Sequence, residues 1–264
     1  MFFLTAFCLV LHCTVPLITW AKPLDKTNEI EFASLESTDS ELNLFEGDIA
    51  GINGLDVLAG QEPRNAIVYE NLLWPNGIVY YSIADNYTAV ELDIIAQAIN
   101  EYETKSCIRF VPRTDQPDYV YIEKTGAGCY SYIGRIGVAQ TVSLDSGCLS
   151  GGLPGTAIHE LLHALGFFHE QSRTDRDDYV IINYSNIQPG TEANFLSYGP
   201  DVIQYLGASY DYGSVMHYGA YSFGIDPSIP TIITRQPGVE IGQRRGFSEV
   251  DLFKLNALYK CNVA

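Results

Sequence analysis

Of all the features in this sequence, the spacing of three histidines places the strongest restriction on the fold. His159 and His163 stand four residues apart, and His169 follows six residues later. Residues four apart on an α-helix share one face, so the first two imidazoles can bind one metal ion. Gly166 can take a left-handed conformation that ends the helix and turns the chain. We therefore predict a helix that ends near Gly166 and a third imidazole that approaches the same metal from another direction.

Glu160 lies between the first two histidines and is not needed as a ligand. Three imidazoles leave a fourth position open for water, which is typical of catalytic zinc sites. Zinc lowers the pKa of bound water to roughly 7, and a nearby carboxylate can act as general base and proton shuttle. We predict one Zn2+ per chain, with Glu160 activating the zinc-bound water. Zinc is preferred over other divalent ions because of the ligand type. A structural zinc site, in contrast to a catalytic one, would need a fourth permanent protein ligand.

The charge balance excludes several classes of protein. The 264 residues include 32 Asp and Glu but only 15 Lys and Arg, a formal net charge of −17. Such a chain lacks the positive charge to neutralise nucleic-acid phosphates or to bind anionic lipid as a polybasic anchor. Hydrophobic residues make up 47% of the chain, which favours a folded core over disorder.

Residues 1–21 form an apolar stretch without Lys or Arg that ends in Thr19-Trp20-Ala21. Small residues at the −3 and −1 positions are typical of a secretory signal peptide, and the apolar run is shorter than the ~20 residues of a membrane span. We predict a signal peptide over residues 1–21 with cleavage near Ala21, and a secreted, extracellular protein without a membrane span. Asn86 and Asn183 begin glycosylation sequons that a secreted chain could use.

Residues 22–64 differ in composition from the rest of the chain. They hold ten acidic and three basic residues with little periodicity, which predicts a mobile acidic leader. The 200 residues at 65–264 are enough for a substantial core.

Hydrophobic patterns and capping signals place several elements in residues 65–264. Thr88 and Glu91 form a capping box before a helical pattern that runs to about Lys105, and Ser248 and Asp251 cap a last helix. Strands are expected over residues 78–83, 108–111, 119–123 and 138–144.

The histidine segment, residues 156–170, resembles the signature of the metzincin zinc endopeptidases, and Glu170 after the third histidine matches the astacin family. Residues 214–218 (Ser-Val-Met-His-Tyr) are similar to that family's methionine turn and its tyrosine. The resemblance covers essentially all of residues 65–264 and includes the segments 107–112, 128–135 and 173–180.

This resemblance implies an α+β fold, the two-lobed metzincin catalytic domain. The upper lobe would hold a mixed, mostly parallel sheet plus helices, and the lower lobe would be irregular with a C-terminal helix. The implied activity is that of a zinc endopeptidase acting on proteins or peptides, and we expect a monomer. The alternatives are a secreted non-catalytic zinc-binding protein and an exopeptidase, for which no pocket for a chain terminus is evident. The physiological substrate stays open, and Arg176 or another basic residue is a candidate for favouring acidic substrate side chains.

The family pattern also implies roles for single residues. Met216 would form an apolar floor beneath the zinc ligands. Tyr218 would reach the zinc in the resting enzyme and then stabilise the oxyanion when substrate binds. Glu170 would pair with a new amino terminus at Asn65, because a buried carboxylate without a partner is costly.

Within the acidic leader, residues 45–49 (Phe-Glu-Gly-Asp-Ile) resemble a short motif of astacin pro-segments whose aspartate binds the catalytic zinc. Gly47 would permit close approach of the backbone, and Asp48 would occupy the position of the water. The protein would then be a zymogen in which residues 22–64 are the pro-segment and 65–264 the catalytic domain. Arg64, which has no basic neighbour nearby, is the expected activation site for a trypsin-like protease.

Two of the six cysteines lie in the predicted signal peptide, and four remain. Four cysteines permit three connectivities, and spacing alone does not choose among them. The family resemblance implies the disulfides Cys107–Cys261 and Cys129–Cys148.

Overall fold

The structure is a computed structural model, and it describes residues 44–52, 70–199 and 205–262. The predicted signal peptide and the expected activation site at Arg64 lie outside the described residues. Among the residues that are described, no helix has both the length and the apolar character needed to cross a membrane.

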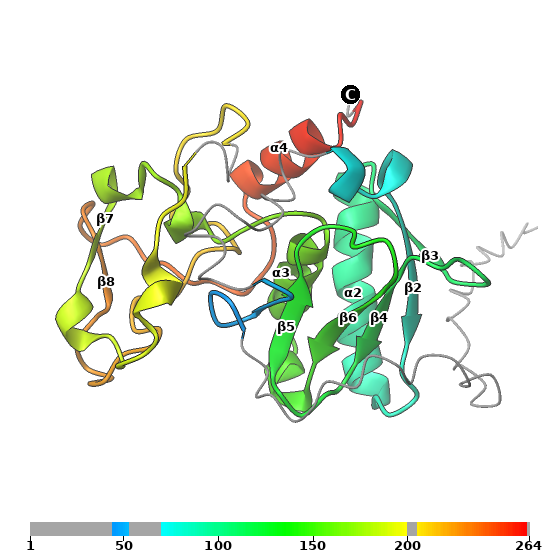
Figure 1. Cartoon of the computed structure of the whole chain (residues 1–264), viewed down its shortest axis with the longest axis horizontal. Coiled ribbons are helices and arrows are strands. Elements are labelled where there is room, and N and C mark those ends of the chain that lie inside the picture. Colours follow the sequence, from blue (N-terminus) through cyan, green and yellow to red (C-terminus); the bar gives the residue numbers. More distant parts are fainter. Residues whose placement is uncertain (1–43, 53–69, 200–204, 263–264) are drawn as a thin grey trace, which may run out of the picture.

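One six-stranded sheet forms the larger lobe (Figure 1). Its spatial order is β1-β5-β6-β4-β2-β3, and every pair is parallel except the antiparallel pair of β5 and β6. The strands span Ile49–Ala50 (β1), Ile78–Ile83 (β2), Arg109–Pro112 (β3), Tyr119–Glu123 (β4), Cys129–Tyr132 (β5) and Ala139–Leu144 (β6). The predicted mixed, mostly parallel sheet is therefore confirmed.

Two helices lie on one side of this sheet, α2 (Ala89–Lys105) and α3 (Gly155–Ala164) (Figure 1). The capping box at the start of α2 is confirmed, since the Thr88 hydroxyl accepts from the Glu91 amide and the Glu91 carboxylate accepts from the Thr88 amide. The apolar face of α2 and nearly the whole surface of α3 are buried, so the sheet and helices enclose one large hydrophobic core.

The second lobe has little regular structure. It contains the antiparallel pair β7 (Val180–Ile182) and β8 (Ile232–Thr234), and a small apolar core of its own. The buried members of that core are Val180, Ile187, Phe195, Tyr210, Tyr218 and Ile232. The C-terminal helix α4 (Glu249–Leu258) returns to the larger lobe and has the expected capping box of Ser248 and Asp251. Each lobe therefore has an apolar core of its own, and the predicted two-lobed fold is confirmed.

Short 3-10 helices connect these elements. They span Glu70–Leu72, Pro75–Gly77, Ser146–Leu149, Glu170–Ser172, Arg176–Asp178, Tyr184–Asn186 and Glu192–Phe195.

Two disulfides connect segments that are distant in the sequence. Cys107 after α2 is bonded to Cys261 after α4, across 154 residues of sequence, and Cys129 is bonded to Cys148 across 19. These are the two pairs that the family resemblance implies.

The structure corrects the description of the leader over residues 44–52. We expected mobility because this segment lacks a periodic pattern, but Ile49 and Ala50 form β1 and pair in parallel with β5. Phe45 and Ile49 are buried in the main core, where Phe45 packs against Tyr198. Two apolar side chains therefore hold the segment, although the sequence around them is acidic and irregular.

Candidate metal centre

Helix α3 carries the first two histidines into the interior. Both side chains are buried, and the helix is held closely at each end. At its start, a Cβ on Gly155 would lie 1.9 Å from the Arg244 carbonyl oxygen, so a larger residue would force the backbone at Arg244 to move. At its end, the Trp74 indole donates a 2.8 Å hydrogen bond to the Ala164 carbonyl. Gly166 then takes a φ of 103°, which confirms the predicted left-handed turn.

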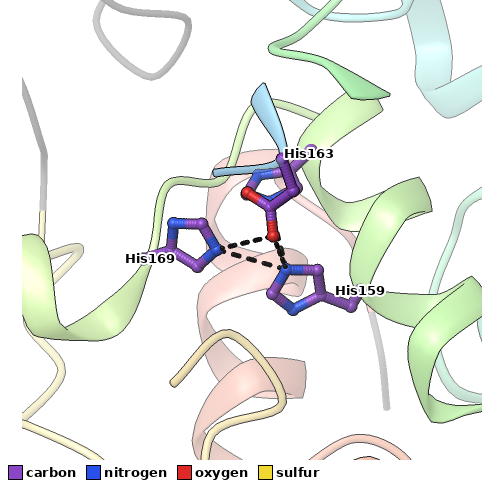
Figure 2. Close-up of side chains that lie close together, drawn as sticks. His159, His163 and His169 are labelled. Carbon is purple, nitrogen blue, oxygen red and sulfur yellow. Dashed lines mark hydrogen bonds and ion pairs between the residues drawn. The ribbon is translucent and has the colours of Figure 1, made fainter. Parts of the chain in front are cut away.

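The turn brings the third histidine back to the first two. Figure 2 shows His159, His163 and His169 converging on one point. Nε2 of His159 lies 3.2 Å from Nε2 of His163 and 3.2 Å from Nε2 of His169. With an oxygen of Asp48, these ligand atoms all lie within 4.8 Å of one another.

The outer nitrogens of the rings show which nitrogen is free to bind a metal. Nδ1 of His159 lies 2.8 Å from the Val215 carbonyl, and Nδ1 of His163 lies 2.7 Å from the Phe167 carbonyl. A carbonyl only accepts, so each Nδ1 carries the proton and each Nε2 presents a lone pair inward. Nδ1 of His169 lies 2.7 Å from Oε2 of Glu46 and donates in the same way. With Nε2 of His169 unprotonated as well, three lone pairs face one point, which is the arrangement of a metal site.

Asp48 completes the cluster from the leader. Its Oδ2 lies 3.2 Å from Nε2 of both His159 and His169, and its Oδ1 is buried without a hydrogen-bond partner among the described residues. Burial would raise the pKa of Asp48, but the surrounding histidines lower it well below its usual value. Three imidazole nitrogens and one carboxylate oxygen are a donor set that zinc prefers, so the residues fit the predicted ion.

Without a bound cation, the pKa values of His159 and His169 shift in opposite directions. Burial, with a smaller contribution from Arg244, lowers the pKa of His159 to about 3. Burial acts the same way on His169, but the charges of Asp48 and Glu46 outweigh it and raise its pKa to about 9. The two carboxylates of the leader therefore favour positive charge at His169.

Glu160 lies beside the cluster, on the same helix. It is buried, and its Oε2 makes no hydrogen bond to any described residue. Burial raises the pKa of Glu160, Asp48 raises it further, and Arg244 opposes both. A buried carboxylate oxygen without a partner is costly in a purely structural role.

The methionine turn, residues 214–218, contacts the segments that carry the histidines. Met216 is buried in the main core, and its carbonyl accepts a 3.0 Å hydrogen bond from the Glu170 amide, next to His169. Asp251 of α4 fixes the turn by accepting from the Ser214 hydroxyl and the Val215 amide. The sequence identified Asp251 only as a helix cap, because its second set of partners lies far away in the chain.

Tyr218 contacts the leader in this structure. Its hydroxyl donates a hydrogen bond to the backbone carbonyl of Glu46, and burial raises the pKa of its phenol. Its predicted contacts with zinc and with an oxyanion belong to a state without the leader and stay predictions.

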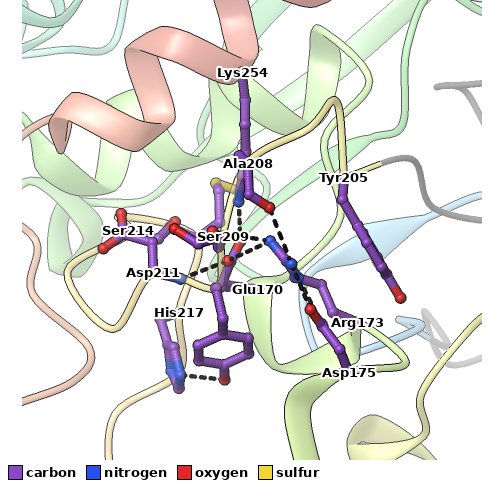
Figure 3. Close-up of polar contacts among 12 residues, drawn as sticks. Glu170, Arg173, Asp175, Tyr205, Ala208, Ser209, Asp211, Ser214, His217 and Lys254 are labelled. Carbon is purple, nitrogen blue, oxygen red and sulfur yellow. Dashed lines mark hydrogen bonds and ion pairs between the residues drawn. The ribbon is translucent and has the colours of Figure 1, made fainter. Parts of the chain in front are cut away.

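Glu170 has partners that the sequence did not reveal (Figure 3). Its carboxylate accepts from Lys254 at 2.5 Å, from Arg173 at 3.2 Å and from the Asp211 amide at 2.9 Å. While the leader is present, these donors compensate the negative charge of Glu170. The amine of Asn65, which we expected to be required, is not needed for this. Asn65 itself lies outside the described residues.

Arg176 is not available to substrate. Its side chain is buried, and its guanidinium donates to the carbonyls of Gln171 and Phe195. The idea that it selects acidic substrates is therefore wrong.

The candidate glycosylation residues differ in their surroundings. Asn86 is exposed in a turn before α2, whereas the Asn183 side chain donates to the Pro230 carbonyl at 3.0 Å and accepts from Ser185.

The fold and site together define the metzincin class: a helix with two histidines four residues apart, a third histidine after a glycine turn that meets the first two, and a methionine turn that contacts the segment after the third histidine. The family model for astacin, which describes a family of peptidases, matches residues 66–260, so the chain belongs to the astacin family.

Curated relatives agree with this assignment. The chain is 46% identical over 230 residues to zinc metalloproteinase nas-13 of Caenorhabditis elegans, covering 82% of this chain and 50% of that protein. It is 44% identical over 232 residues to zinc metalloproteinase nas-15 of the same organism, covering 83% of this chain and 40% of that protein. The chain thus spans about half the length of these relatives or less. Zinc, the predicted cofactor, is the metal that both names give.

Among solved structures, high choriolytic enzyme 1, a hatching-enzyme zinc protease of the medaka fish Oryzias latipes, matches with a TM-score of 0.66 and 39% identity. The match covers 74% of this chain and 93% of that one. Myroilysin, at 21% identity and a TM-score of 0.55, covers 74% of this chain and 98% of its own, and it shares the fold.

Proposed function

We propose that this chain is the secreted zymogen of a zinc endopeptidase. The observation that carries the proposal is Glu160: it is buried directly after His159 on the helix that carries two of the three converging imidazoles, and one of its carboxylate oxygens has no partner among the described residues. His159, His163 and His169 would hold the zinc. Proteins or peptides would be the substrates, with a monomer as the active unit.

Zinc held by three imidazoles supplies a Lewis acid that polarises a carbonyl and makes a water molecule more acidic. Glu160 takes the proton of the attacking water and returns it to the leaving amine, which its buried, poised carboxylate suits. Tyr218, once free of Glu46, donates its hydroxyl to the carbonyl oxygen as negative charge develops there. Met216 and Asp251 keep the loop behind His169 in place.

Latency follows from the leader. Asp48 occupies the ligand position that a water needs, and β1 pairs with the edge of β5. An extended substrate would need the same strand edge, because main-chain hydrogen bonds to an open edge bind extended peptides. Residues 44–52 therefore block both the metal and the substrate position.

Activation would remove the leader by a cut near Arg64, made by a trypsin-like protease. The domains are then a signal peptide (1–21), an acidic pro-segment (22–64) and an astacin-like catalytic domain (65–264). The new amine at Asn65 would join the donors around Glu170. Glycans on Asn86 or Asn183 would accompany secretion to the extracellular space.

A non-catalytic zinc-binding protein would use Asp48 as a permanent fourth ligand. Glu160 disfavours this alternative, because a structural site has no use for a buried carboxylate oxygen that lacks a partner among the described residues.

The experiment is to express the precursor in a secretory host, treat it with trypsin, and measure hydrolysis of a quenched fluorescent peptide. We expect activity to begin with the cut near Arg64 and to stop with phenanthroline. The Glu160→Gln precursor should bind zinc equally well but be roughly a thousandfold less active after the same cut. Comparable activity in this variant would reject Glu160 as general base.

A further inference from the structure

Glu46 makes more contacts with the metal centre than its place in an acidic leader suggests. Its side chain is buried, with 1% of its surface exposed. Oε2 accepts a 2.7 Å hydrogen bond from Nδ1 of His169, and Oε1 accepts from the Ser172 hydroxyl. Its backbone carbonyl accepts from the Tyr218 hydroxyl. One residue of the leader thus contacts a metal ligand, its neighbouring 3-10 helix and the tyrosine of the methionine turn.

The leader contacts His169 at both ring nitrogens. Glu46 binds Nδ1, and Asp48 lies 3.2 Å from Nε2. This arrangement requires a sharp backbone turn, with φ of 49° at Glu46 and 78° at Gly47. The first value places a non-glycine residue in the left-handed region, which is unfavourable. The contacts that Glu46 makes must therefore outweigh both this strain and the burial of a carboxylate.

His169 differs from the other two ligands in where its outer partner comes from. His159 and His163 donate Nδ1–H to the carbonyls of Val215 and Phe167, which belong to the catalytic domain and stay after activation. The partner of His169 leaves with the leader. Outer hydrogen-bond partners fix the orientation and basicity of a ligating histidine, and losing one typically costs about 10–100-fold in metal affinity.

We propose that Glu46 is a positioning residue for His169, so that the leader strengthens zinc binding through this outer contact as well as through Asp48. The precursor then holds its metal until activation, and removal of the leader releases Tyr218 and loosens His169 in one step. This inference rests on the proposed function, because it assumes that the leader is removed.

The test measures zinc affinity and not turnover. Wild-type, Glu46→Gln and Glu240→Gln precursors are stripped of metal and titrated with zinc against a chromogenic chelator. Glu240 is an exposed acid outside the cluster and serves as the matched control. We expect the zinc dissociation constant of the Glu46→Gln precursor to rise roughly tenfold, and that of the Glu240→Gln precursor to stay unchanged. Equal affinity in the wild-type and Glu46→Gln precursors would overturn the proposal.

The cut supplies an internal control. After trypsin activation, the wild-type and Glu46→Gln proteins are the same molecule, so their zinc affinities must agree. A Ser172→Ala precursor keeps the leader sequence intact and removes one partner of Glu46. We expect it to weaken zinc binding before the cut and not after it. An equal loss in both forms would assign Ser172 to the catalytic domain alone and count against the role of Glu46.

The two proposals can fail separately. If the activated protein shows no peptidase activity, the zinc titrations of the precursors still decide the role of Glu46. If activity is present but the Glu46→Gln precursor binds zinc as tightly as the wild type, only the inference on Glu46 falls.

Discussion

Nζ of Lys254 lies 2.5 Å from Oε2 of Glu170, and both side chains are buried. The pair joins α4 to the residue that directly follows the third histidine of the metal centre. Arg173 and the Asp211 amide complete the set of donors around the carboxylate. The C-terminal helix therefore stabilises the loop that carries His169, although Lys254 and Glu170 lie 84 residues apart in the sequence.

Replacing Lys254 tests this connection. Lys254→Met should destabilise the protein by about 3 kcal/mol, because a buried carboxylate loses its closest positive charge. Chemical denaturation measures the change. The double variant Lys254→Met with Glu170→Gln should recover part of the loss, since no charge is then left without compensation. An unchanged free energy of unfolding in Lys254→Met would show that Arg173 alone suffices.

Replacing Asp48 tests latency. The Asp48→Ala precursor should hydrolyse a small peptide without any cut, because the ligand position is no longer occupied by the leader. Asp115→Ala, at an exposed acid, is the control and should stay silent. If the uncut Asp48→Ala precursor is also silent, Asp48 is not the latch.

Gly155 tests the close contact at the start of α3. Gly155→Ala should lower the free energy of unfolding by about 1–3 kcal/mol, since its Cβ would lie 1.9 Å from the backbone oxygen of Arg244, which cannot move without shifting its loop. Gly147→Ala is the matched control, because a Cβ there meets nothing within 4 Å. The measurement is the thermal unfolding midpoint of each variant. Equal midpoints for Gly155→Ala and Gly147→Ala would contradict the close packing of Gly155 against Arg244.

Glu91 gives a pH-dependent contribution to stability. Hydrogen bonds from Lys124 and then from the Thr88 backbone lower the pKa of Glu91 from 4.5 to about 2. Because the folded pKa is the lower one, the contribution is fully present above about pH 4.5 and is lost as the pH falls towards 2. Solvent screens part of this interaction, so Glu91→Gln should be less stable by roughly 1 kcal/mol at pH 7. Urea denaturation at several pH values measures the difference in free energy of unfolding between the wild type and Glu91→Gln. This difference should shrink below pH 4.5, and a constant difference down to pH 2 would show that it does not come from the lowered pKa of Glu91.

The sequence by itself determined the features that depend on local spacing. Residues four apart on a helix must share a face, so the pairing of His159 and His163 follows from their positions alone. Capping boxes are equally local, and both Thr88 and Ser248 start helices as expected. Strands with strong apolar alternation were placed to within a residue, whereas β1, β5, β7 and β8 were missed because they are short and their register depends on distant partners.

Only the tertiary structure decided which distant residues meet. Lys254 beside Glu170, Asp251 beneath Ser214, and Glu46 at the outer nitrogen of His169 are separated by 37 to 123 residues, and no spacing rule connects them. The motif around Asp48 could suggest a latch, but its neighbour Glu46 looked like one more acid in an acidic run. The structure shows that Glu46 is buried. A buried carboxylate needs hydrogen-bond donors, and those of Glu46 are His169 and Ser172 at the metal centre.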